Sequence, residues 1–179
     1  MKIVIIDDEN DKVLAIRKRL LSENVNSGDI IEISRRPEGV HLWQDYAYPL
    51  IREIKEGGDR VCIFLDWTLY RKEGKEQTTY WVRDLQKNNT LQEGDTVICS
   101  STINAEQFRE MYFLARGSGC TFEHFNENNR EVVISGGVNI VCGGSRMSEI
   151  EFVKDLIDQE ISSERVQNES DLDRGLERE

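Results

Sequence analysis

Short apolar runs alternate with helical patterns along most of the chain, and each run ends in acidic or hydroxyl residues. The runs at residues 2–6, 60–65 and 96–99 read KIVII, RVCIFL and TVIC, and are the length of buried strands. Between them, apolar residues recur every three or four positions, as on a helix with one buried face. Strands that alternate with helices in this way build a parallel sheet with helices on both faces.

We expect five strands before residue 126, at residues 2–6, 30–34, 60–65, 96–99 and 120–125. Helical patterns follow at residues 11–23, 40–56 and 79–86, and after Asn104. Asn10 is the expected cap of the first helix. Pro49 lies inside the second helical pattern and predicts a kink there or two short helices. Residues 71–76, RKEGKE, read as a charged loop.

The pattern changes after residue 130. Residues 131–142 carry two β-branched runs joined by two glycines, which predicts a hairpin that extends the sheet edge beyond a fifth strand. Its apolar edge is a candidate homodimer surface. A last helix is expected at 148–161. We therefore expect one domain over residues 1–161, followed by a polar, disordered tail at 162–179.

The charge balance disfavours several classes of partner. The 179 residues include 34 acidic and 23 basic ones, so the formal net charge is −11. Binding to nucleic acid or anionic lipid needs clustered Lys and Arg, and we expect neither partner. No apolar run approaches the roughly 20 residues that span a bilayer. We expect a cytoplasmic protein whose four cysteines are reduced.

Polar residues at the strand ends predict a functional site. Ligands of open parallel sheets bind at the carboxyl ends of the strands. The first strand is followed by Asp7 and Asp8, the third by Asp66 and the fourth by Ser100. If the first and third strands are neighbours, three carboxylates converge, and a divalent cation such as Mg²⁺ would neutralise their repulsion. Asp66 would then suit nucleophilic attack on a phosphoryl group, and Ser100 would form a hydrogen bond to the product.

Plainer explanations stay open for each of these residues. Asp7 or Asp8 could simply cap the following helix without a metal. Asp66 alone would be an ordinary loop acid, and Ser100 could equally be a turn-forming hydroxyl.

The succession IVIIDDEN, IFLDWTL and VICSST resembles the receiver domain of bacterial response regulators over residues 2–126 and the last helix. The resemblance implies a flavodoxin-like α/β fold, a doubly wound parallel five-stranded sheet of order 2-1-3-4-5. It implies that Asp66 is the phosphoacceptor and that Ser100 contacts the phosphoryl group. It also implies Mg²⁺ bound by the side chains of Asp7, Asp8 and Asp66 and the backbone carbonyl of Thr68. A histidine kinase or an output protein would be the partner.

The chain departs from this family where a lysine is expected after the fifth strand. Asn126 occupies that place, and no lysine stands between Lys87 and Lys154. Asn donates a hydrogen bond but carries no charge. We expect a stand-alone receiver-like signalling protein that acts through a protein partner. The alternatives are a non-phosphorylated pseudo-receiver that serves as a constitutive interaction module and, less favoured, a small Mg²⁺-dependent phosphohydrolase or phosphotransferase.

Overall fold

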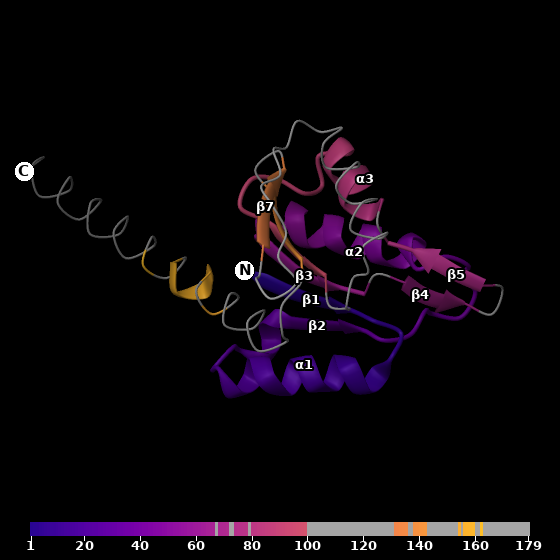
Figure 1. The fold of residues 1–179 in the computed structure, drawn as a ribbon, viewed down its shortest axis with the longest axis horizontal. Coiled ribbons are helices and arrows are strands. Elements are labelled where there is room, and N and C mark those ends of the chain that lie inside the picture. The colour runs from indigo at the N-terminus through magenta and orange to yellow at the C-terminus, as the bar shows by residue number, and fades with distance from the viewer. Residues whose placement is uncertain are drawn as a thin grey trace, which may run out of the picture.

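A computed structural model shows an α/β fold in which a central sheet lies between helices (Figure 1). It describes residues 1–66, 68–71, 74–78, 80–99, 131–135, 138–142, 154, 156–159 and 162. Ser100, Asn126 and the predicted elements at 104–117 and 120–125 lie outside the described residues, as does the tail from residue 163. The helices of the described ranges are too short or too polar to span a bilayer.

Six strands form the main sheet, in the order β2-β1-β3-β6-β8-β7. Their bounds are β1 Lys2–Ile6, β2 Ile30–Ile33, β3 Val61–Leu65, β6 Thr96–Cys99, β7 Glu131–Ser135 and β8 Val138–Cys142. The pairs β1–β2, β1–β3 and β3–β6 are all parallel. The predicted order of the first four strands is therefore confirmed.

The hairpin predicted at 131–142 is also confirmed, but it joins the sheet at a different place. β7 and β8 pair in antiparallel fashion, with Val132 opposite Val141. β8 pairs directly and in parallel with β6, with Val97 opposite Ile140. Because β6 has β3 on its other side, the expectation that the hairpin lies beyond a fifth strand is wrong. The β-branched run VNIVC suits a sheet position with neighbours on both sides.

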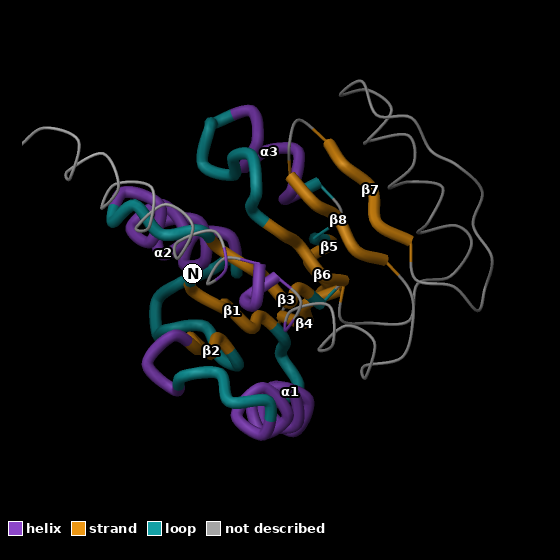
Figure 2. Tube along the Cα trace, turned by 90° about the vertical axis from the view of Figure 1, so that its left-hand side faces the viewer, coloured by secondary structure: helices purple, strands orange, loops and turns teal. Residues whose placement is uncertain are grey.

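Within the described residues, three α-helices pack on the sheet, and a short 3-10 helix at Ser27–Asp29 precedes β2. They are α1 Asn10–Ser22, α2 Gln44–Glu56 and α3 Trp81–Lys87. Residues 156–159 are helical as well, within the helix predicted at 148–161. Figure 2 shows α1 and α2 on opposite faces of the sheet.

The structure corrects one local expectation about the helices and excludes one of the two alternatives expected at Pro49. Glu9, not Asn10, is the N-cap of α1. The reason is that the Glu9 N–H donates to Asp7 Oδ1, which turns the chain one residue earlier. α2 is one helix that continues through Pro49, not two short ones. Its apolar face buries Ala47, Ile51 and Ile54 against the sheet, which outweighs the loss of one backbone donor.

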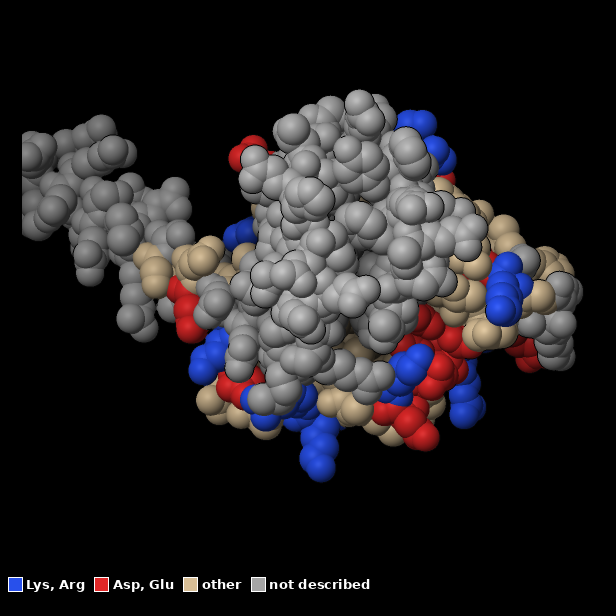
Figure 3. All heavy atoms as spheres, viewed as in Figure 1, with Lys and Arg blue, Asp and Glu red and all other residues tan. Residues whose placement is uncertain are grey.

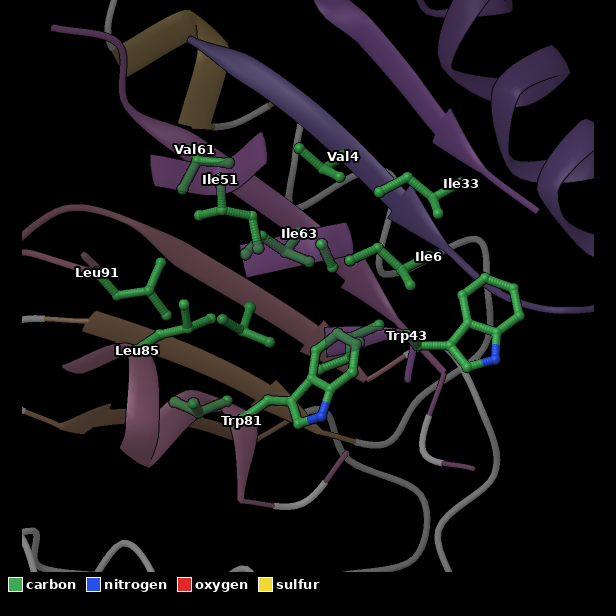
Figure 4. Packing of buried hydrophobic residues seen from close by; sticks show 14 of the residues in the cluster. Val4, Ile6, Ile33, Trp43, Ile51, Val61, Ile63, Trp81, Leu85 and Leu91 are labelled. Carbon is green, nitrogen blue, oxygen red and sulfur yellow. The ribbon is translucent and has the colours of Figure 1, made fainter. Parts of the chain in front are cut away.

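The alternation of side chains along β1 separates two hydrophobic cores. Val4 and Ile6 face the core under α2 and α3, which also holds Trp43 and Trp81 (Figure 4). Ile3 and Ile5 face the core under α1. Both cores therefore pack against the same strand, β1. Asp7, which directly follows β1, is held in place by this well-packed scaffold.

Residues 71 and 74–76 of the charged segment that was expected to be a loop belong to a second, two-stranded sheet. β4 (Thr68–Arg71) pairs in antiparallel fashion with β5 (Gly74–Gln77). Glu76 is buried, and its carboxylate accepts the backbone N–H groups of Trp43 at 2.8 Å and Gln44 at 3.1 Å. A carboxylate at a helix N-terminus satisfies N–H groups that the helix leaves open, so Glu76 caps α2 from another element.

Candidate metal centre

Three acidic side chains meet at the carboxyl edge of the sheet. Asp7 and Asp8 follow β1, Asp66 follows β3, and these strands pair in parallel with Ile6 opposite Leu65. Each residue offers one carboxylate oxygen, and the three oxygens lie within 4.8 Å of one another. Figure 3 shows acidic side chains gathered on the side where β1 ends and α1 begins. The predicted convergence of the three carboxylates is confirmed.

Asp7 is the most deeply buried of the three, with a relative exposure of 1%. Its Oδ1 accepts the Glu9 N–H at 2.8 Å, as a residue that organises a helix start would do. Its Oδ2 is buried and has no hydrogen-bond partner among the described residues. Capping of the helix therefore explains only one of the two carboxylate oxygens.

The electrostatics of Asp7 follow from this position. Burial raises the pKa of the Asp7 carboxyl to about 6, and the charges of Asp66 and Asp8 act in the same direction. The Glu9 N–H and the ammonium of Lys12 oppose the shift. The fold thus holds a carboxylate where its ionised form is disfavoured until a cation is supplied.

Backbone contacts hold Asp66 in place at the end of β3. Its N–H donates to the Ile6 carbonyl at 2.9 Å, which extends the β1–β3 pairing beyond the strands. Its carbonyl accepts the Thr78 hydroxyl at 2.6 Å. Asp66 is 6% exposed, so the residue sits in a buried position at the rim.

The β4–β5 hairpin reaches the same site through its backbone. The Tyr70 N–H donates to Asp8 Oδ2 at 3.2 Å, and the Tyr70 carbonyl accepts the Trp43 indole N–H at 3.0 Å. Both backbone groups of Tyr70 therefore bond on the side of β4 away from β5. Backbone groups two residues apart in a strand face the same side. The Thr68 carbonyl therefore faces the edge of β4 on which Asp8 is bound.

Lys12 is a charged neighbour of the site that the sequence analysis missed. It lies in the first turn of α1 and forms an ion pair with Glu9, with Nζ and Oε1 at 2.5 Å. The pKa of Lys12 is raised, because partial burial, which lowers it, is outweighed by Glu9, Asp7 and Asp66. The available signal was its place in the first turn of the helix that directly follows Asp7 and Asp8.

The donor set fits a divalent metal ion. Carboxylate oxygens, and a backbone carbonyl at this edge, are the ligands that hard cations such as Mg²⁺ and Mn²⁺ take. The buried Oδ2 of Asp7 has a bond to make, and a cation would satisfy it. Asp7, Asp8 and Asp66 would hold the ion, and the site would leave positions for water or an anionic ligand.

Comparison with protein-family models, with curated protein sequences and with solved structures found no match to this chain. The residues of the site and their surroundings therefore carry the functional inference.

Proposed function

We propose that the chain is a receiver-like signalling protein in which Asp66 accepts a phosphoryl group beside a divalent cation, with Mg²⁺ as the physiological ion. One observation carries the proposal. Three carboxylates meet at the ends of two adjacent strands, and one of their oxygens, Asp7 Oδ2, is buried without a partner among the described residues. Such an arrangement costs stability, and unfavourable buried charge is typical of a functional site.

The chemistry assigned to the site is transfer of a phosphoryl group to a carboxylate. A carboxylate oxygen of Asp66 forms a bond to phosphorus while the bond between phosphorus and the leaving oxygen of the donor breaks. The leaving group departs with that electron pair, as acetate does from acetyl phosphate. A bound Mg²⁺ stabilises the negative charge of the phosphoryl oxygens. Asp66 is a suitable acceptor because Ile6 and Thr78 hold its backbone at the rim.

Other residues of the proposal have supporting roles. The Thr68 carbonyl, which faces the Asp8 edge of β4, is the proposed fourth protein ligand. Ser100 is the proposed hydroxyl contact to the phosphoryl group and lies outside the described residues.

The proposed output is a change of surface that a protein partner reads. The β4–β5 hairpin is bonded to Asp8 through Tyr70 and to Asp66 through Thr78, so a new ligand at the site acts on both contacts. The Tyr70 side chain is 56% exposed, and the Lys75 ammonium lies 5.1 Å from its ring centroid. A histidine kinase upstream and an output protein downstream, in the cytoplasm, complete this proposal.

The direct test is phosphorylation by a small donor. The protein is incubated with acetyl phosphate and Mg²⁺, and its intact mass is measured. We expect gain of one phosphoryl group, which is lost with EDTA and in Asp66→Asn. The matched control is Asp29→Asn, which removes an acid paired with Lys2 away from the site and should leave labelling unchanged.

Other outcomes would redirect the proposal. Binding of Mg²⁺ without any labelling would refute phosphorylation and leave the constitutive interaction module. Repeated release of phosphate from the donor, beyond one turnover per protein, would instead indicate a phosphohydrolase. Absence of both metal binding and labelling would refute the metal site itself.

A further inference from the structure

Lys12 is tied to the acidic site through the backbone as well as through its charge. Its N–H donates to the Glu9 carbonyl at 2.9 Å, and the Glu9 N–H donates to Asp7 Oδ1 at 2.8 Å. The first turn of α1 therefore places Lys12 next to the turn that Asp7 organises. The Lys12 side chain is 25% exposed, so its stem lies largely against the protein, while its ammonium pairs with Glu9 in an exposed position.

The ammonium of Lys12 pairs with an exposed carboxylate, and two buried carboxylates also attract its charge. Its ion pair is with Glu9, whose side chain is 60% exposed. An exposed pair of this kind contributes little, because water screens it and two side chains lose freedom. The charges of Asp7 and Asp66 also act on Lys12. Little free energy is therefore lost when Lys12 leaves Glu9 and binds an anionic group on Asp66.

The charge of the site changes in a way that calls for such a cation. Three carboxylates and one divalent ion sum to about −1, and an acyl phosphate in place of the Asp66 carboxylate makes the sum about −2. The phosphoryl oxygens carry this added negative charge. A flexible lysine with three N–H donors can reach them, where a fixed carbonyl or amide would add no charge.

We infer that Lys12 binds an anionic oxygen of the group carried by Asp66 and supplies the positive charge that Asn126 lacks. This inference rests on the proposed function, since it names a binding residue for the same phosphoryl group. It assigns the role to the first turn of α1, at the end of β1. In the absence of the anion, Glu9 retains Lys12 at the rim of the site.

The experiment compares a cation and an anion as probes of the same site. Mg²⁺ alone is titrated first, and beryllofluoride, a phosphoryl mimic, is then titrated at saturating Mg²⁺. In Lys12→Gln we expect beryllofluoride affinity to fall about tenfold, because a charge-assisted hydrogen bond is lost. Mg²⁺ affinity should rise by about twofold to fivefold, because a nearby positive charge is removed.

Two further variants separate charge at this position from other effects. Lys12→Arg keeps the charge and should retain most of the beryllofluoride affinity. Lys18→Gln removes an exposed lysine from the same helix and should change neither affinity. The opposite changes in cation and anion affinity are the signature, since a merely structural role of Lys12 would lower both.

The outcomes distinguish this inference from the function on which it rests. Unchanged beryllofluoride affinity in Lys12→Gln, with normal Mg²⁺ binding, overturns the role of Lys12 and leaves the phosphoacceptor proposal standing. A parallel fall of both affinities also overturns it. Failure of the wild-type protein to bind either probe overturns both proposals.

Discussion

Two buried aspartates lie at opposite ends of the strands of the same sheet, and their surroundings differ. Asp95 precedes β6 and is fully buried. Its Oδ1 accepts the Lys55 ammonium and the Val61 N–H, each at 2.9 Å, and its Oδ2 accepts the Gln92 N–H at 2.8 Å. Asp7 is buried to nearly the same extent at the other edge, where Oδ2 has no partner among the described residues.

The difference separates a structural carboxylate from a ligand-binding one. Asp95 joins the amino ends of β3 and β6 and has an opposite charge at contact distance. Asp7 is surrounded by like charges from Asp8 and Asp66, and the ammonium of Lys12 is bound to Glu9. Burial alone therefore does not identify a functional acid, whereas burial without a complete set of partners does.

The largest expected effect on stability is at the amino ends of β3 and β6, where Asp95 lies. Asp95→Ala should destabilise the protein by about 3 kcal/mol, because it strands the partly buried Lys55 ammonium and two backbone donors. Urea denaturation followed by far-UV circular dichroism measures the change, which should be the same with and without Mg²⁺. Asp29→Ala is the control, since it removes an exposed ion pair and should cost less than about 1 kcal/mol. A small loss in Asp95→Ala would contradict the contrast between the two edges.

The opposite sign is expected at the carboxyl edge. Asp7→Asn should stabilise the metal-free protein by about 2 kcal/mol, because it removes a buried charge among like charges. The amide oxygen can still accept the Glu9 N–H. The same denaturation experiment in EDTA measures the gain, and Mg²⁺ should no longer stabilise the variant. Asp11→Asn, an exposed acid in the first turn of α1, is the matched control and should change stability little. Destabilisation by Asp7→Asn would show that this carboxylate is structural.

The smallest effect is a dependence on pH that belongs to Asp7. Its pKa is about 6 in the folded protein and near 3.9 when unfolded, so the folded state holds the proton more tightly. Stability of the metal-free protein should therefore fall as pH rises from about 4 through 6, by about 1 kcal/mol between pH 5 and 7. Saturating Mg²⁺ should offset this loss, because it favours the ionised carboxylate. Parallel pH profiles for wild type and Asp7→Asn would rule this out.

The carboxyl edge was predictable because its signals are local. Apolar runs of strand length end directly in Asp7, Asp8 and Asp66, and parallel strands bring their ends to one rim. The order of the first four strands then makes the carboxyl ends of β1 and β3 adjacent. Only this strand order is non-local, and in the sequence analysis it was an expectation from the resemblance.

The missed features depend on partners that lie far away in the sequence. Glu76 stands in a run of charges that reads as solvated, yet it is buried because it caps a helix that begins 32 residues earlier. The direct pairing of β8 with β6 depends on which of two segments, β8 or the expected fifth strand, occupies the position beside β6. Lys12 reads as an ordinary surface lysine until Asp66 is brought close to it by the sheet.

The acids follow β1 and β3, two of the inner strands of the sheet, and this affects how long the site persists. β1 lies between β2 and β3, and β3 lies between β1 and β6. Inner strands open only with the whole domain, whereas peripheral elements open and close at much lower free energy. The spacing of Asp7 and Asp66 therefore lasts for the lifetime of the fold. The contact of Tyr70 with Asp8 comes from a separate two-stranded sheet, so it can break and re-form many times within that lifetime.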